Sequence, residues 1–322
     1  MAAMAARMRR VLVLAKRSAY DMYVARHQDP AFTRFLSEPQ MVGNLRDRHE
    51  VHERTVRVCK DILSRRQPHV QFEMHLRDEL QSPIRDVDLV ITVGGDGTLL
   101  QASHYVDNSI PVLGVNSDPT QTDEVELNLH RFDASRSTGH LCAATANNLE
   151  QMLDDILDGG MKPVELTRIS TFIDGVKIDA PALNDVLIAH PNPAAISRCS
   201  FSIRREDVEE SCTPIIHSRS SGLRISTATG STAAMKSAGG TVMPVLSTNL
   251  QYMVREPNSP HPNYTRFMQG FLESKRILKI DWRSRKGVVY VDGSHLCYPI
   301  DFGCKIDVSN DAPPLRIFWK QK

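Results

Sequence analysis

The sequence has no excess of charge of either sign and no long apolar segment. Its 39 basic and 38 acidic residues give a formal net charge of +1, which provides no long-range field to attract a polyanion such as DNA. The longest apolar run near the N-terminus, residues 11–15, is far shorter than the ~20 residues that span a bilayer. We therefore expect no nucleic-acid partner and no membrane anchor. Any anionic ligand must be bound by local groups.

The cysteines lack the spacing of a metal or redox site. None of the six forms a Cys-x-x-Cys pair, and none has a histidine partner at zinc spacing. We interpret them as reduced, buried thiols in a reducing compartment; they are Cys59, Cys142, Cys199, Cys212, Cys297 and Cys304.

A reducing compartment favours the cytoplasm. An organellar location is the alternative, because residues 1–17 contain five basic residues and no acidic one, as a short leader would. The C-terminus, Trp319-Lys320-Gln321-Lys322, shows no Ser-Lys-Leu-like peroxisomal signal.

The chain is long enough for two domains, and its pattern changes midway. The first half alternates continuous apolar runs with amphipathic segments, which is typical of a parallel sheet covered by helices. The predicted strands are residues 11–15, 87–93 and 110–115, and the predicted helices are residues 49–66 and 147–157.

From about residue 163 the sequence predicts short strands separated by turns. Asp174-Gly175 and Asp292-Gly293 are strong hairpin signals. A helix is expected over residues 231–238, and residues 256–265 are expected to form a long surface loop. We therefore predict an α/β domain over residues 1–160 and a β-rich domain over residues 161–322. The last segment of the second domain could return to the first.

One glycine-rich turn carries the strongest chemical signal. Gly94-Gly95-Asp96-Gly97-Thr98 follows a buried strand and leads into an expected helix, so backbone N–H groups and the positive end of the helix can bind a phosphate. The turn differs from a Walker motif, because no Gly-Lys-Ser/Thr follows it.

Asp96 is the only acidic residue of this turn. A carboxylate beside bound phosphates is repelled unless it has a chemical role. It could accept a proton from an attacking hydroxyl, or bind the magnesium that accompanies a nucleotide. The structural alternative is an aspartate that caps the following helix.

The turn resembles one shared by NAD kinases, diacylglycerol kinases, sphingosine kinases and, more loosely, phosphofructokinases. Two segments of the second half resemble NAD kinases: Asn184-Asp185 at the start of a strand, and Ser220–Gly240, which contains Thr229-Gly230-Ser231-Thr232-Ala233-Ala234. Taken alone, these segments could be an Asx turn and a helix cap. The resemblance extends from Val11 to about Phe318 and is greatest to the plant NADH kinase branch, in residues 83–88, 114–121 and 132–141.

This resemblance implies a two-domain NAD kinase-like fold with a site between the domains. It also implies ATP as phosphoryl donor, Mg²⁺ as the accompanying cation and a homodimer. Asp96 would be the catalytic base, and Gly94, Gly95, Gly97 and Thr98 would bind ATP phosphates. No protein metal ligands are predicted. The implied dinucleotide-binding residues are Asn184, Asp185, Arg219, Ser221, Thr229, Thr232, Ala233, Ala234 and Ser237.

The sequence departs from the family pattern at several positions. Ser117-Asp118-Pro119 replaces a Gly-x-Leu-Gly-Phe segment, while Ser221, Ala228 and Ala234 replace an aspartate, a proline and a tyrosine. Loss of the aspartate removes a negative charge that would attract oxidised nicotinamide, so we expect NADH to be preferred over NAD⁺. A lipid kinase and a binding-only dinucleotide sensor remain the alternatives to this function.

Overall fold

The computed structural model describes residues 9–27, 39–128, 135–205, 213–258 and 261–320. It divides the chain into two compact units. The α/β unit comprises Met1–Val164 and Arg316–Lys322, and the β unit comprises Glu165–Leu315. The expected boundary lay at residues 160 and 161, four residues before the observed division.

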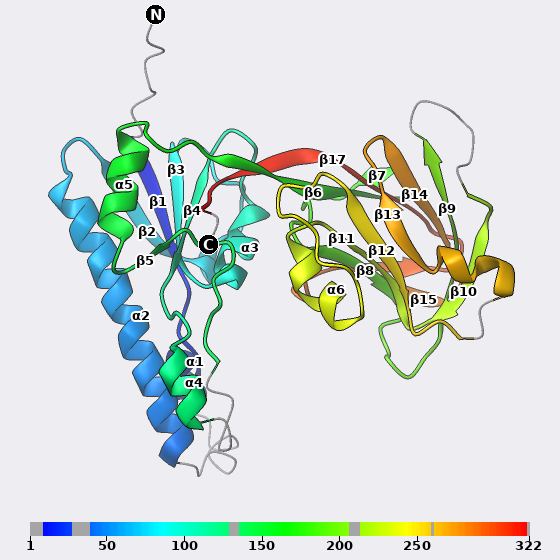
Figure 1. Cartoon of the computed structure of the whole chain (residues 1–322), viewed down its shortest axis with the longest axis horizontal. Helices are drawn as coiled ribbons and strands as arrows, with labels where there is room; N and C mark the ends of the chain where they lie inside the picture. Colours follow the sequence, from blue (N-terminus) through cyan, green and yellow to red (C-terminus); the bar gives the residue numbers. More distant parts are fainter. Residues whose placement is uncertain (1–8, 28–38, 129–134, 206–212, 259–260, 321–322) are drawn as a thin grey trace, which may run out of the picture. The chain divides into compact units, whose positions relative to one another are not determined.

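The α/β unit is built on parallel strands (Figure 1). The strand order in the sheet of this unit is β17-β4-β3-β1-β2, and only the C-terminal end of β17 belongs to it. β17 pairs with the first residues of β4, and β5 pairs with its last two residues. The strands are β1 (Arg10–Ala15), β2 (Gln71–Leu76), β3 (Leu89–Gly94), β4 (Val112–Asn116), β5 (Ala144–Thr145) and β17 (Lys305–Phe318). Three predicted strands are confirmed as β1, β3 and β4, because continuous apolar runs suit strands that are buried on both faces.

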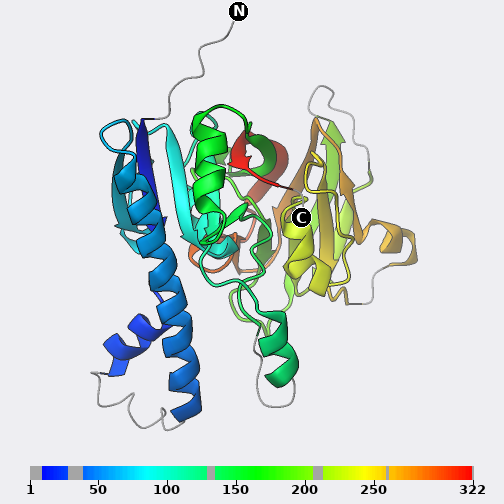
Figure 2. The same ribbon diagram turned by 60° about the vertical axis from the view of Figure 1, so that its left-hand side comes forward.

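Helices cover both faces of this sheet. Apolar residues of α2 and α5 share one core cluster with Leu113 and Val115 of β4, and Figure 2 shows these two helices, in blue and green, beside the strands. Gly114 has the opposite orientation and faces Leu99 of α3. The helices are α1 (Ala19–His27), α2 (Pro39–Arg65), α3 (Asp96–Ser103), α4 (Thr122–Asn128) and α5 (Leu149–Leu157), with a 3-10 turn, η2, at Arg77–Glu79.

The β unit consists of two sheets that share one apolar core. One sheet contains β6 (Val164–Ile173), β7 (Val176–Lys177), β9 (Ser197–Arg205), β10 (Ile216–Ser220), β14 (Arg276–Trp282) and most of β17. The other has the order β13-β12-β11-β8-β15-β16. Its strands are β8 (Asp185–Ala189), β11 (Gly222–Ser226), β12 (Leu250–Arg255), β13 (Gln269–Leu272), β15 (Lys286–Val291) and β16 (Leu296–Asp301).

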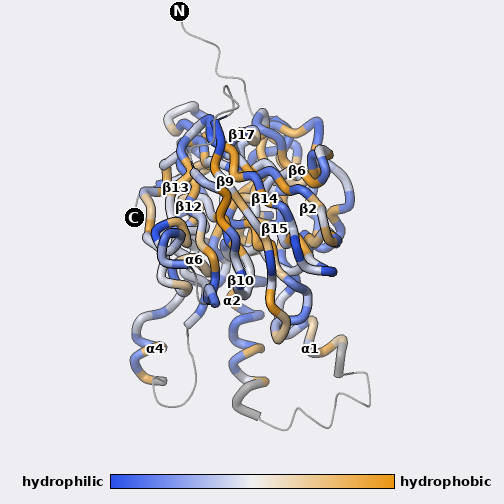
Figure 3. The backbone as a smooth tube through the Cα atoms, turned by 90° about the vertical axis from the view of Figure 1, so that its right-hand side faces the viewer, coloured by the Kyte–Doolittle hydropathy of each residue, from blue (hydrophilic) through white to orange (hydrophobic). Residues whose placement is uncertain are grey.

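Several strands of the β unit, among them β10, β14 and β15, alternate buried and more exposed side chains. In Figure 3 their tubes change between orange and blue along the chain. Both predicted hairpins are confirmed: Asp174-Gly175 joins β6 to β7, and Asp292-Gly293 lies between β15 and β16. All four of these residues have positive φ, as tight hairpin turns require.

Helical structure in the β unit is limited to short turns in the residues described. These are η3 (Gly230–Thr232), α6 (Ala234–Ser237) and η4 (Pro262–Phe267). The helix expected over residues 231–238 is therefore divided into two short pieces. The expected surface loop over residues 256–265 contains the start of η4, and residues 259–260 lie outside the described residues. No helix of the described chain has both the length and the apolar content to cross a membrane.

Candidate functional site

The glycine turn lies at the carboxyl edge of the parallel sheet. β3 ends at Gly94, Gly95 is the N-cap residue of α3, and α3 begins at Asp96. The first two glycines are required by close packing, since a Cβ on Gly94 would collide with the Thr98 side chain and one on Gly95 with Ser137. Strand order reverses at β1, which has β2 on one side and β3 on the other. Open α/β sheets bind ligands at such a switch point.

Asp96 does not cap its own helix. No side-chain cap hydrogen bond is present at the start of α3. Instead, one carboxylate oxygen accepts the backbone N–H of His140 at 2.9 Å and the other accepts that of Leu141 at 2.9 Å. The Cys142 thiol also donates to the oxygen that accepts from Leu141, at 3.8 Å, so the oxygen that accepts from His140 is the one with a lone pair left for a further donor. The carboxylate is thus fixed in direction and still able to accept a further proton.

The loop that holds Asp96 is itself anchored from two sides. The indole Nε1 of Trp319 donates to the His140 carbonyl oxygen at 3.1 Å. Asn116, at the end of β4, donates from Nδ2 to the Ser137 carbonyl oxygen at 3.0 Å. Gly139 has φ 59° and packs so closely on Asn116 that a side chain would collide. These contacts keep the loop in register with Asp96, although residues 132–134 of this resembling segment lie outside the described residues.

Two basic residues that the sequence did not single out lie at the same edge of the sheet. Arg77 follows β2, and its guanidinium Nη1 lies 3.5 Å from Thr98 Oγ1 and 4.0 Å from the position of a Cβ on Gly97. Lys16 follows β1, and its backbone N–H donates to the Val93 carbonyl oxygen at 3.1 Å. Burial lowers the pKa of Lys16, and the charges of Arg77 and Arg48 lower it further, against an opposing effect of Asp118. The turn therefore has cations beside it.

The segment that departs from the family pattern forms a buried polar network. Ser117 Oγ lies 2.8 Å from Nδ1 of His52, whose Nε2 lies 3.0 Å from the Lys16 carbonyl oxygen. Because a carbonyl oxygen only accepts, Nε2 must carry the proton and Nδ1 must accept from Ser117. Burial and the charge of Lys16 lower the pKa of His52 to about 4, so the ring is neutral at physiological pH.

Asp118 belongs to a buried ion-pair cluster. It pairs with Arg136 at 2.8 Å, and each of these side chains is only 7% exposed. Arg136 also pairs with Glu124 of α4 at 2.6 Å and with Asp47 of α2 at 2.5 Å. The replacement of the usual glycine-containing segment thus coincides with an internal link between the end of β4, α2 and α4.

In the β unit, Asp292 organises the predicted Asn184-Asp185 turn. Its carboxylate accepts the backbone N–H groups of Leu183 at 2.8 Å, Asn184 at 2.7 Å and Asp185 at 2.9 Å. The Asn184 side-chain oxygen is buried and has no hydrogen-bond partner among the described residues. An unpaired buried acceptor costs about 1–3 kcal/mol, and a ligand hydroxyl would satisfy it.

The Asp185 side chain, unlike the side-chain oxygen of Asn184, already has a partner in the protein. It forms an ion pair with Arg224, and both side chains are largely buried. Burial raises the pKa of Asp185, the charge of Arg224 opposes this effect, and Asp292 adds to it. The sequence alone did not indicate either partner, because Arg224 and Asp292 are brought to Asp185 only by strand pairing.

The hydroxyl-rich segment packs against the Asn184 turn. The Asn184 carbonyl oxygen accepts the Thr227 N–H at 2.9 Å, and a Cβ on Gly230 would collide with that same oxygen. Thr229 is buried. Beyond it the chain turns outward, and the following predicted residues are exposed: Thr232, Ala233, Ala234 and Ser237. The structure therefore brings these residues together with Asn184.

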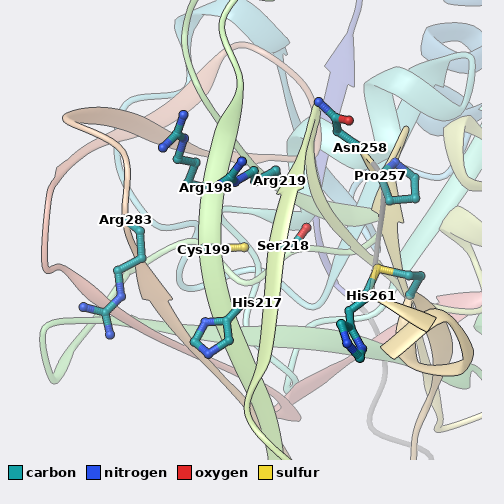
Figure 4. Close-up of a pocket in the computed structure, with 10 residues that line it drawn as sticks. Arg198, Cys199, His217, Ser218, Arg219, Pro257, Asn258, His261 and Arg283 are labelled. Carbon is teal, nitrogen blue, oxygen red and sulfur yellow. The ribbon is translucent and has the colours of Figure 1, made fainter. Parts of the chain in front are cut away.

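Arg219 and Ser221 lie at the other end of β11 from this group. Ser221 precedes the first residue of β11, whereas Asp185 pairs with Ser226 at its end. Five residues of extended strand span roughly 17 Å. Arg219 lies on β10 and lines a separate pocket of the β unit (Figure 4). The predicted dinucleotide-binding residues thus form two groups within this unit.

These features describe an α/β unit with a glycine-rich turn at the carboxyl edge of its sheet, joined in one chain to a β unit with a buried amide acceptor. Residues 3–118 match a family model described as the ATP-NAD kinase N-terminal domain. The chain is 49% identical to a protein of Oryza sativa subsp. japonica named "Probable NADH kinase", over 88% of this chain and 86% of the relative. It is 48% identical to the NADH kinase of Arabidopsis thaliana, over 88% of each. The chain therefore belongs to the NAD kinase family.

The fold is also similar to that of a solved NAD kinase. The crystal structure of an NAD kinase from Archaeoglobus fulgidus in complex with ATP aligns with a TM-score of 0.62, covering 97% of this chain and 94% of the other. At 18% sequence identity this likeness shows the fold alone. It confirms the predicted NAD kinase-like architecture, with a parallel α/β part and a β-rich part.

Proposed function

We propose that this chain transfers the γ-phosphate of ATP to the 2′-hydroxyl of the adenosine ribose of NADH, giving NADPH and ADP, and that NAD⁺ is a poorer acceptor. The observation that carries the proposal is the fixed carboxylate of Asp96 inside the glycine-rich turn at the start of α3. Membership of the NAD kinase family supports the reaction, and the names of the two plant relatives support the reduced acceptor.

In this reaction the turn Gly94–Thr98 binds the transferred phosphate through its backbone N–H groups. Asp96 accepts the proton of the ribose hydroxyl as that oxygen attacks, since the carboxylate oxygen that accepts the His140 N–H has a second lone pair that the loop does not use. Arg77 and Lys16 offset the negative charge of the donor phosphates. A guanidinium suits this role because its fork of N–H groups matches phosphate oxygens.

Mg²⁺ fits this site as a companion of the nucleotide. The nearby carboxylate of Asp118 is paired with Arg136, and both oxygens of Asp96 already accept an N–H bond. Magnesium is commonly held by substrate phosphates with one or two carboxylates and several waters. When bound, it neutralises phosphate charge. Asp96, the acidic residue of the glycine turn, would be its neighbour in the protein.

In the β unit, Asn184 accepts a hydrogen bond from a ribose hydroxyl through its unpaired side-chain oxygen. The exposed residues Thr232, Ala233, Ala234 and Ser237 contact the same ligand, with Asp185 and Thr229 behind them. Arg219 and Ser221, which form the second group of predicted binding residues, also contact the dinucleotide. We further propose a cytoplasmic homodimer with small-molecule substrates and without a nucleic-acid or membrane partner. The formal net charge of +1 supports the absence of a nucleic-acid partner, because it provides no long-range attraction for a polyanion.

The decisive test is an assay of purified chain with ATP, Mg²⁺ and each acceptor in turn: NADH, NAD⁺ and a diacylglycerol. NADP(H) is measured with an NADP(H)-specific cycling enzyme, because NADH and NADPH absorb alike. We expect phosphorylation of NADH, slower phosphorylation of NAD⁺ and none of the lipid. Dinucleotide binding without turnover would identify a sensor, and lipid phosphorylation would identify a lipid kinase.

A further inference from the structure

Three side chains that can bind a metal ion meet where α1 packs against α2. Asp21 lies in the first turn of α1, and His49 and Glu53 lie four residues apart on α2. Residues at this spacing share one face of a helix, and two metal ligands of a zinc protease motif have the same spacing. A ring nitrogen of His49 and one carboxylate oxygen from each acid all lie within 4.8 Å of one another. Figure 2 shows α1, in dark blue, beside α2.

The start of α1 fixes the direction of the Asp21 carboxylate. Ser18 precedes this helix, and its hydroxyl oxygen accepts the Asp21 backbone N–H at 3.0 Å. In return, Oδ2 of Asp21 accepts the Ser18 backbone N–H at 3.2 Å and the Ser18 hydroxyl at 2.7 Å. This reciprocal arrangement is a capping box. The other oxygen, Oδ1, lies 3.6 Å from Nδ1 of His49, so the helix cap occupies one oxygen and leaves the second facing the histidine.

The Glu53 carboxylate has no ion-pair partner among the described residues. Arg57 lies one helical turn further along α2, but its Nε donates to the Glu53 carbonyl oxygen at 3.4 Å. Two carboxylates this close repel each other when both are ionised. A protonated His49 would compensate only one of the two negative charges, whereas a divalent cation compensates both.

The donor set and its exposure suit a transition metal. The Asp21 side chain is 41% exposed and that of His49 is 24% exposed, so an ion can enter from solvent. Imidazole nitrogen with carboxylate oxygen suits zinc and related metals, whereas Mg²⁺ and Ca²⁺ are bound through oxygen. Zinc binds such ligands at about 2.0–2.2 Å, which places ligand atoms of a tetrahedral site roughly 3.3–3.5 Å apart. Small side-chain adjustments therefore close the site.

We propose that Asp21, His49 and Glu53 form a binding site for a divalent transition metal ion of the zinc class, with water completing the coordination. The ion ties α1 to α2. One turn along α2 from His49, the Nε2 atom of His52 lies 3.0 Å from the Lys16 carbonyl oxygen, so the same helix also holds the segment between β1 and α1. The three ligands are not residues of the glycine turn, and the site is independent of the proposed reaction because binding is measured without nucleotide.

The test is calorimetric titration of Zn²⁺ into the full chain after dialysis against a chelator. The variants are His49→Gln and Glu53→Gln. The matched control is Glu50→Gln, which removes an exposed acid of the same helix that lies outside the cluster. Loss of an outer partner of a metal ligand typically weakens binding about 10–100-fold, so loss of a ligand itself should raise Kd for zinc at least about tenfold. Glu50→Gln should stay within about twofold of wild type.

A second readout is Tm, because an ion that binds the folded chain raises it. Zinc should raise Tm of wild type and of Glu50→Gln more than that of the two cluster variants. Zinc bound at other surface histidines contributes equally to all of these proteins, so the comparison isolates the cluster.

A hundredfold excess of Mg²⁺ should not displace zinc. Far-UV circular dichroism verifies folding, and Glu53→Gln decides the matter if His49→Gln unfolds, because the Glu53 carboxylate has no ion pair to lose. The proposal is wrong if the cluster variants bind zinc like wild type, if Glu50→Gln weakens binding as strongly as they do, or if Mg²⁺ displaces the ion.

Discussion

Replacing Asp96 by asparagine should separate the chemical role of this residue from its structural one. The carboxylate accepts two backbone N–H groups, one on each oxygen. An amide can accept only one of them, and its NH₂ group then faces the other donor. We expect a loss of about 1.5–3 kcal/mol of unfolding free energy, the usual value for one hydrogen bond to a charged group.

That loss should lower Tm by roughly 3–12 °C for a unit of this size. The effect on turnover should be far larger than the stability change suggests. Removal of a general base typically slows the reaction by about 10²–10⁴-fold, while substrate binding should be nearly retained. Turnover is measured with NADH and ATP by NADP(H)-specific cycling at a temperature well below the variant's Tm.

Trp319→Phe provides the matched control. It removes the indole N–H bond to the His140 carbonyl oxygen and so disturbs the same loop without touching the carboxylate. We expect less than about a tenfold fall in turnover, because one neutral hydrogen bond contributes about 0.5–1.5 kcal/mol. Two results would refute the reasoning. One is an Asp96→Asn enzyme within threefold of wild type, and the other is a Trp319→Phe enzyme that is equally slow.

Four further predictions address binding, stability and specificity. Asn184→Ala should weaken the dinucleotide by about 1–3 kcal/mol without lowering Tm, since the lost oxygen has no protein partner; an equal rise in KM for ATP would indicate structural damage instead. Arg77→Ala should raise KM for ATP about tenfold or more while leaving KM for NADH unchanged, and the reverse pattern would place Arg77 at the acceptor. His52 has a folded-state pKa of about 4, below its ordinary value. Its contribution to the free energy of unfolding is therefore complete above pH ~6.5 and is lost as pH falls toward 4, by at most about 3 kcal/mol. Denaturant unfolding measured at several pH values should show this pH dependence for wild type and not for His52→Gln. Ser221→Asp should shift the ratio of kcat/KM values toward NAD⁺ by about five- to tenfold, because one charge pair contributes about 1 kcal/mol after screening. An unchanged ratio would contradict the electrostatic account of acceptor choice.

Local sequence signals located the elements that position the α/β site. β1, β3 and β4 follow from unbroken apolar runs, and the two Asp-Gly hairpins follow from residues that tolerate positive φ. Helix α2 begins ten residues before its predicted start at His49. Its first part, Pro39–Arg48, contains Pro39 and Gly43, two residue types of low helix propensity, so the local sequence did not favour a helix there.

The sequence could not show which side chains fix the predicted site residues. Asp292 reads as a hairpin residue, and its three bonds to the Asn184 turn arise only because β15 pairs with β8. From the sequence alone, Arg77 is interpreted as an exposed charged residue after a strand. In the structure, the order of the strands places it beside Thr98. The role of Asp96 in holding residues 140 and 141 is likewise a contact across more than forty positions. Contacts of this kind depend on topology, which no local pattern specifies.

The origin of the α/β unit from two separate stretches of chain affects how the protein is made. Residues 316–319 supply a strand partner for β4 and the indole that anchors the Asp96 loop, yet they follow the whole of the β unit. Domains usually fold during synthesis in the order in which they leave the ribosome. Here the glycine turn is synthesised early, but its supporting loop gains its final contact only after residue 319 emerges. Chains released prematurely would therefore carry every predicted site residue and still lack the arrangement that orients the carboxylate.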